Sequence, residues 1–223
     1  MTLIGHMENK VIAIILARGG SKGIPDKNII DIKGKPLLAY TIEVAQGVLD
    51  ISEVWVSTDS EQIEEVAVEY GANVLRRPKE ISGDKSQSEE ALKHFAQEVD
   101  FNTMVFIQPT SPLLQSKDVS KGLKMMGEYD SIFSAYKEHW IPRWTKLNTP
   151  YEWSINNRPM RQDKEELFVE NGAFYITTKK GLLSSGLRYS GKIGICEMPL
   201  HRSFQIDTQE DLKLIKKIMV LSK

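Results

Sequence analysis

The sequence predicts a doubly wound α/β fold, in which a mostly parallel sheet carries helices on both faces. Two observations lead to this expectation. Short apolar runs alternate with segments of helical period along the chain up to residue 136. Polar clusters follow the ends of these runs, where open α/β sheets bind their ligands. A chain of 223 residues with 41% hydrophobic and 26% charged residues suits one such domain.

The first elements are strands and helices in strict alternation. Residues 11–16, VIAIIL, are wholly apolar, which is typical of a strand covered on both faces. Further strands are predicted at 54–56, 72–75, 103–107 and 131–136, and helices at 36–48, 60–70, 87–99 and 116–126. Right-handed crossovers bring the carboxyl ends of such strands to one edge of the sheet. We therefore expect a single Rossmann-like domain over residues 8–223.

The pattern changes after residue 136. Residues 137–166 are rich in Trp, Pro, Asn and Arg and have no clear period. Three of the four Trp lie there, which argues against disorder. We therefore predict an inserted lobe that packs against another protein surface. Strands are predicted at 167–177 and 193–196, and a last helix at 208–221 with Asp207 as its cap.

Composition excludes several classes of protein. The 29 basic and 30 acidic residues leave a net charge of −1, whereas a general nucleic-acid binder needs a basic surface. One Cys excludes a disulfide framework, and four scattered His argue against structural zinc. No apolar run approaches the roughly 20 residues that span a bilayer. Without a signal-peptide pattern, we expect a cytoplasmic protein. Residues 1–7 contain Gly-His-Met and are interpreted as a possible cloning remnant.

The loop after the first strand, LARGGSKGIPDKN over residues 16–28, carries the strongest chemical signal. Its three glycines allow tight turns and close approach to a ligand, and successive N–H groups can form an anion-binding nest. Arg18, Lys22 and Lys27 add three cations. The spacings of the Walker A loop and of the dinucleotide fingerprint are both absent. The loop therefore predicts a polyphosphate site of another kind.

ARGGSKGIPDKN closely resembles the first motif of the CMP-sialic acid synthetases, or acylneuraminate cytidylyltransferases. Further matching motifs follow in order: VSTDSEQI, LRRP, FIQPTSPL, RQ followed by ENGAFYI, and IDTQEDL. The resemblance covers residues 11–212. The Kdo cytidylyltransferases are relatives, but their first motif usually carries Arg where this chain has KGIPDKN.

The resemblance implies an enzyme that joins a nine-carbon 2-keto-3-deoxy sugar acid to CMP. The anomeric C2 hydroxyl attacks the α-phosphate of CTP, and pyrophosphate leaves. The resemblance also implies Mg²⁺ as cofactor and a homodimer, in which the inserted lobe of one subunit completes the site of the other. Two alternatives stay open: a nucleotidyltransferase for Kdo or another sugar, and a non-catalytic nucleotide-binding paralogue.

The same resemblance assigns residues to each ligand. Arg18, Lys27 and Asp207 are implied to be catalytic. The nucleotide is implied to contact Arg18, Gly19, Ser21, Lys22, Lys27, Asn28, Arg77 and Ser88, with Arg76 as the adjacent alternative to Arg77. The sugar acid is implied to contact Gln108, Arg161, Tyr175 and Tyr189, with Arg161 donated by the neighbouring subunit. A core position in its strand is an equally good interpretation of Tyr175.

Asp207 is the implied magnesium ligand, and it stands in a motif that departs from the family pattern. Many members carry D-I-D, whereas this chain has Gln205 in place of the first acid. One carboxylate can suffice because Mg²⁺ also takes phosphate oxygens and water as ligands. Otherwise the affinity for metal is reduced, or another acid helps.

The sugar side departs from the pattern as well. Arg188-Tyr189 stands where sialic-acid-specific members have an aromatic pair against the N-acyl group. Val169 stands where the family has Arg. These changes favour a related sugar acid, with legionaminic, pseudaminic and deaminated sialic acid as candidates.

Overall fold

The computed structural model describes residues 9–139, 141–163 and 165–221, so the interpretation of residues 1–7 lies outside it. The strands are β1 (Val11–Leu16), β2 (Glu53–Thr58), β3 (Asn73–Arg76), β4 (Thr103–Ile107), β5 (Ser131–Lys137), β6 (Arg143–Trp144), β7 (Pro150–Tyr151), β8 (Phe168–Thr178) and β9 (Ile193–Glu197). The helices are α1 (Leu37–Gln46), α2 (Glu61–Glu69), α3 (Ser88–Glu98), α4 (Ser116–Met125), α5 (Lys179–Ser185) and α6 (Gln209–Leu221).

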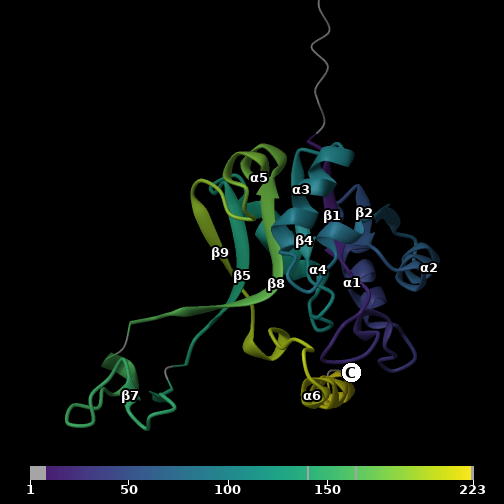
Figure 1. Ribbon diagram of the computed structural model, residues 1–223. Helices are drawn as coiled ribbons and strands as arrows, with labels where there is room; N and C mark the ends of the chain where they lie inside the picture. The colour runs from purple at the N-terminus through teal and green to yellow at the C-terminus, as the bar shows by residue number, and fades with distance from the viewer. Residues whose placement is uncertain (1–8, 140, 164, 222–223) are drawn as a thin grey trace, which may run out of the picture.

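The described residues form a seven-stranded sheet in the order β3-β2-β1-β4-β8-β5-β9 and a separate pair β6-β7 (Figure 1). Neighbouring strands from β3 to β4 are parallel, as are β5 and β9. β8 runs antiparallel to both β4 and β5. The expected α/β class with a mostly parallel sheet is confirmed, and each predicted strand and helix has its counterpart.

Two features among the strands and α-helices were not predicted from the sequence. One is the β6-β7 pair, whose two-residue strands are too short for a periodic pattern. The other is α5, which is only seven residues long. α5 begins after Thr178, whose side chain accepts a hydrogen bond from the Gly181 N–H, and it ends at Gly186 with φ of 71°. These capping groups define the helix more clearly than its polar sequence KKGLLSS does.

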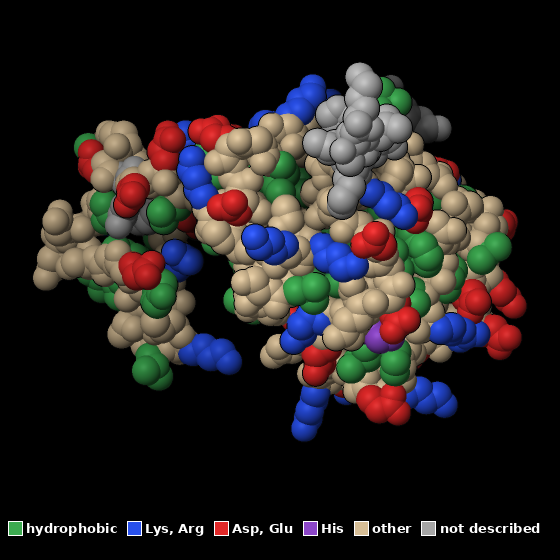
Figure 2. Space-filling model, turned by 90° about the horizontal axis from the view of Figure 1, so that it is seen from above, with side chains coloured by type: hydrophobic (Ala, Val, Ile, Leu, Met, Phe, Trp, Pro, Cys, Tyr) green, Lys and Arg blue, Asp and Glu red, His purple; other side chains and the backbone are tan. Residues whose placement is uncertain are grey.

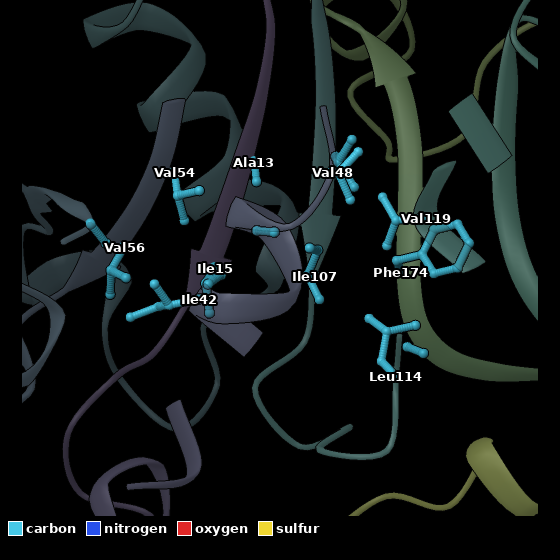
Figure 3. Close-up of a cluster of buried hydrophobic side chains, with 14 of the residues drawn as sticks. Ala13, Ile15, Ile42, Val48, Val54, Val56, Ile107, Leu114, Val119 and Phe174 are labelled. Carbon is cyan, nitrogen blue, oxygen red and sulfur yellow. The ribbon is translucent and has the colours of Figure 1, made fainter. Parts of the chain in front are cut away.

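Alternate residues of β1 face opposite layers of helices. Ala13 and Ile15 belong to a buried cluster that includes residues of α1, α2 and α4, such as Ile42 and Val119 (Figure 3). Ile12 and Ile14 face a second cluster, to which α3 and α5 contribute. Burial on both faces explains why β1 is apolar at every position.

α6 packs at the end of the sheet rather than on a face. Its Leu212 and Ile215 form a third buried cluster with Ile24 and Ile32, which lie between β1 and α1, and with Leu37, the first residue of α1. Figure 1 shows α6 beside this segment, below the ends of the central strands. The packing brings the residues that precede α6 to the loop after β1.

The described residues between β5 and β8, 138–139, 141–163 and 165–167, extend from the body as an arm (Figure 1). Within it, the rings of Trp144 and Trp153 meet edge to face at 5.1 Å. Its exposed apolar side chains include Ile141, Trp144, Leu147, Ile155 and Met160. Figure 2 shows the end of the molecule where β1 begins, and side chains of both charges are interspersed on it. A dimer formed through the arm stays a prediction.

Candidate functional site

A cavity of about 410 Å³ opens at the carboxyl ends of β1 and β4. The chain passes from β1 to β2 and β3 on one side and returns to β4 on the other, so this gap is the topological switch point of the sheet. The cavity is lined by Leu16, Arg18, Ser21, Lys22, Gly23, Lys27, Asn28, Ser88, Phe106, Gln108, Pro109, Thr110 and Asp207. The fold thus brings eight of the predicted site residues together: Arg18, Ser21, Lys22, Lys27, Asn28, Ser88, Gln108 and Asp207.

The loop after β1 is braced by hydrogen bonds of its own groups. The Gly19 N–H donates to Asp59 Oδ1 at 2.9 Å. The buried Asn28 donates from Nδ2 to the Arg18 carbonyl oxygen at 3.0 Å, which closes the loop on itself. Gly23 lies so close to the Asp207 carbonyl that an added Cβ would come within 2.8 Å of that oxygen. A glycine is therefore required where this loop meets the segment before α6.

Each cation that lines the cavity is paired with a carboxylate. Arg18 Nη1 and Lys22 Nζ lie 2.9 and 2.5 Å from the two oxygens of Asp84. Lys27 Nζ lies 2.9 Å from Asp207 Oδ1. The hydrogen bonds from Lys22 and then Arg18 hold the pKa of the Asp84 carboxyl below its usual value. The sequence analysis missed Asp84, whose place in the turn before α3 marks the ligand edge of the sheet but does not reveal its partners.

The prediction that Asp207 caps the last helix is wrong. α6 begins at Gln209, and the Thr208 hydroxyl accepts the hydrogen bond of the Asp211 N–H at 3.2 Å. In return, the Asp211 carboxylate accepts from the Thr208 N–H at 2.7 Å. This reciprocal pair is a capping box with Thr208 at its start. The Asp207 side chain is consequently free to face Lys27 and the cavity.

Gln205 has a structural partner. Its Nε2 donates to the Asn171 carbonyl oxygen at 2.6 Å and lies 3.4 Å from Ser111 Oγ. A carboxylate at this position could not donate either bond. Over the described part of the chain, no group of three or more His, Cys, Asp or Glu side chains is arranged to hold a metal ion. Asp207 remains as the carboxylate that lines the cavity.

The structure does not bring Arg77 into the cavity lining with the other predicted nucleotide contacts. Its buried guanidinium donates to Ser57 Oγ at 3.1 Å and to the Ser57 carbonyl at 2.7 Å. Burial lowers its pKa from the ordinary value. The alternative, Arg76, is exposed and lies 2.6 Å from Glu64. The assignment of either arginine to cytosine stays a prediction.

The two predicted sugar-side tyrosines stand behind the cavity floor. Tyr175 is 3% exposed, and its ring stacks at 5.6 Å on Phe106, which lines the cavity. The hydroxyls of Tyr175 and Tyr189 both donate to the carboxylate of Glu170. Burial, and then the bond to Glu170, raises the pKa of Tyr175 to about 12. The core interpretation of Tyr175 thus fits this chain's own packing.

Arg188 connects the Tyr175 and Tyr189 side chains to the start of α3. Its guanidinium lies 4.7 Å from the centre of the Tyr175 ring, and its Nε donates to Glu89 Oε1 at 2.7 Å. The two side chains are only 14% and 16% exposed. Burial raises the pKa of Glu89, but the bond and charge of Arg188 outweigh it and leave that pKa below its ordinary value. No periodic pattern in the sequence indicates that Glu89 pairs with Arg188, or that Glu170 accepts hydrogen bonds from the two tyrosines.

Arg161 lies on the arm, in the short helix η3 (Arg161–Asp163), where it contacts His139. Figure 1 shows the arm directed away from the body, so Arg161 is not gathered with the cavity residues of its own chain. This position is compatible with a role in a neighbouring subunit, and that role stays a prediction.

The family model described as Cytidylyltransferase matches residues 12–222. The chain belongs to the cytidylyltransferase family. This cytidylyltransferase-family chain is 40% identical over 211 residues to N-acylneuraminate cytidylyltransferase B of Danio rerio, a match covering 89% of this chain and 49% of that protein. It is 33% identical over 222 residues to pseudaminic acid cytidylyltransferase of Campylobacter jejuni, which covers 93% and 95% of the two chains.

The fold of this family member resembles the structure of CMP:2-keto-3-deoxy-manno-octonic acid synthetase complexed with CTP. The TM-score is 0.72 at 18% identity, over 96% of this chain and all of the other. The family predicted from the motifs is confirmed, and it is a family of nucleotidyltransferases, as expected. The chain spans about half the length of the Danio rerio relative.

In the described residues, no helix is long and apolar enough to cross a membrane.

Proposed function

We propose that this protein is a Mg²⁺-dependent cytidylyltransferase that activates a nonulosonic, sialic-acid-like sugar acid with CTP. The products are the CMP-sugar and pyrophosphate. One observation carries the proposal: Arg18, Lys22 and Lys27 converge on one cavity at the switch point of a cytidylyltransferase-family sheet. Three cations beside a glycine-rich loop suit a triphosphate better than an uncharged ligand.

In this proposal the triphosphate lies against the loop after β1. Arg18 and Lys27 offset the charge that grows on the α-phosphate and on departing pyrophosphate as the sugar C2 hydroxyl attacks. Ser21, Lys22 and the loop N–H groups add donors, and Gly19 keeps the backbone close. Asn28 and Ser88 stand toward the nucleoside. Gln108, at the end of β4, orients the sugar acid, so catalysis rests mainly on positioning.

Asp207 would hold Mg²⁺ together with phosphate oxygens and water. Its carboxylate lines the cavity beside the phosphate-binding loop, and it is 63% exposed, so it suits an ion held largely by substrate. When bound, Mg²⁺ would neutralise part of the phosphate charge. Gln205 cannot replace a second carboxylate, since its amide donates to Asn171.

The proposed sugar is a relative of sialic acid, with pseudaminic, legionaminic and deaminated sialic acids as candidates. Arg188 and Tyr189 make the layer behind the cavity floor more polar than an aromatic pair would. Similarity over nearly the whole length of pseudaminic acid cytidylyltransferase supports the same choice. The proposal includes a cytoplasmic homodimer, whose arm brings Arg161 to the partner's site.

The test is pyrophosphate release with CTP and Mg²⁺, measured in parallel with N-acetylneuraminic, deaminated sialic, legionaminic, pseudaminic and Kdo acids. Release with one nine-carbon acid is expected. Release with Kdo alone would favour the Kdo alternative. CTP binding without turnover on any acid would instead indicate a non-catalytic paralogue.

A further inference from the structure

The Asp84 carboxylate forms ion pairs with Arg18 and Lys22, two of the cations that the proposed function assigns to phosphate. Its Oδ1 lies 2.9 Å from Arg18 Nη1, and its Oδ2 lies 2.5 Å from Lys22 Nζ. Arg18 Nη1 also lies 3.4 Å from the Ser82 carbonyl oxygen. These contacts place one carboxylate between two cavity-lining cations, which are also the kind of groups that bind phosphate oxygens.

Hydrogen bonds that do not involve the Asp84 side chain stabilise the turn that carries Asp84. Ser82 Oγ donates to the Pro78 carbonyl at 2.8 Å, and the Ser86 N–H donates to the Gly83 carbonyl at 3.1 Å. The turn leads directly into α3, whose first residue, Ser88, lines the cavity. Asp84 therefore links the phosphate-binding loop to the opposite rim of the cavity without being needed to shape its own turn.

The two ion pairs are open to solvent, which makes them easy to exchange. The side chains of Asp84 and Lys22 are 44% and 77% exposed, and that of Arg18 is 33% exposed. Exposed pairs are weak because water and salt screen them. A polyphosphate offers several charged oxygens to the same cations, and Arg can bind it bidentately, so it competes well with one carboxylate.

We propose that Asp84 is a resident counter-ion, which holds Arg18 and Lys22 toward the cavity, yields them to the triphosphate and takes them back as pyrophosphate leaves. This inference rests on the proposed function. Asp84 acts through the two cations and is thus a positioning residue. Its removal should strengthen the binding of free pyrophosphate, because the competing charge is gone, and should slow pyrophosphate release in turnover.

Calorimetric titration of the full chain with inorganic pyrophosphate tests this directly. For Asp84→Asn we expect a dissociation constant about two- to tenfold lower than for wild type at low salt. The difference should shrink as salt rises, because the lost contacts are ionic. Asp84→Glu keeps the charge and should restore the wild-type constant. Asp100→Asn is the matched control, since Asp100 pairs with Lys179 at 3.3 Å away from the cavity.

Unchanged or weaker pyrophosphate binding in Asp84→Asn would overturn the inference, because a purely structural role predicts weakening. Absence of pyrophosphate binding in wild type would overturn it too. Thermal melts check that each variant folds. If Asp84→Asn does not fold, Asp84→Ser replaces it in the titration. The titration needs neither sugar nor turnover. A silent sugar panel with tighter binding in Asp84→Asn would therefore reject the proposed function alone, whereas turnover with unaltered pyrophosphate binding would reject the inference alone.

Discussion

Lys27 Nζ and Asp207 Oδ1 lie 2.9 Å apart, although 180 positions separate the two residues in the chain. The contact joins the loop after β1 to the segment that leads into α6. Lys27 is the more enclosed partner, with 18% of its side chain exposed against 63% for Asp207. The proposed phosphate-binding lysine is thus fixed in direction, while the proposed metal ligand remains accessible.

Lys27→Ala is expected to lower turnover about a hundredfold or more, because it removes a positioned charge from the phosphate site. Steady-state pyrophosphate release measures the loss, and circular dichroism checks the fold. Lys213→Ala is the control, since Lys213 is exposed on α6. Kinetics equal to wild type in Lys27→Ala would remove Lys27 from phosphate binding.

Asp207→Asn is expected to raise the Mg²⁺ concentration for half-maximal turnover at least about tenfold, because a neutral amide is a poorer ligand than a carboxylate. The amide oxygen can still accept the bond from Lys27, so the loop should stay in place. A magnesium titration of the rate measures the change, and Asp50→Asn, at an exposed position, is the control. An unshifted titration would argue against Asp207 as ligand.

Arg161→Ala is expected to lower turnover while leaving CTP binding nearly intact, because Arg161 lies on the arm and not in its own chain's cavity lining. A mixing experiment makes the test sharper. Arg161→Ala and Lys27→Ala subunits, each impaired alone, should regain turnover when exchanged into mixed dimers, since one shared site is then intact. A fully active wild-type monomer would contradict the shared site.

Glu89→Gln is expected to lower the free energy of unfolding by about 2 kcal/mol at neutral pH, because the enclosed Arg188 loses its charged partner. Hydrogen bonding and charge from Arg188 outweigh burial and keep the pKa of Glu89 below 4.5. A lowered pKa gives stability that is full above 4.5 and is lost as the pH falls through the folded-state value.

The gap between wild type and Glu89→Gln should consequently narrow as the pH falls below about 4.5. Urea unfolding at a series of pH values measures it. Glu98→Gln, exposed on the same helix, is the control. A gap that stays constant to low pH would show that the charge of Glu89 has no part in the pair.

An element of the fold could be predicted where the residue pattern of that segment alone indicates a strand or a helix. VIAIIL, short and rich in β-branched residues, is typical of a strand covered on both sides, and β1 is that strand. The antiparallel insertion of β8 between β4 and β5 left no such signal, because pairing between distant strands depends on partners that a local pattern does not name. The same holds for α5, which is set by its caps.

The site could be predicted where residues follow strand ends and missed where they act through other side chains. Arg18, Lys27 and Gln108 stand at the cavity because they follow β1 and β4. Asp84 and Glu89 were missed because a charged residue in a polar segment resembles any solvated one until its partner is known. Asp207 was misread as a cap because Thr208, the next residue, is an equally good one.

Trp55 and Trp144 lie in two optically different environments. Trp55 is partly buried in the body against Phe95, with ring centres 5.8 Å apart, whereas Trp144 on the arm is 53% exposed. Indole emission shifts to longer wavelength as water gains access to the ring. The red side of the fluorescence spectrum is therefore weighted toward Trp144 on the arm, and the blue side is weighted toward Trp55 in the body. A single unlabelled sample can follow both parts at once.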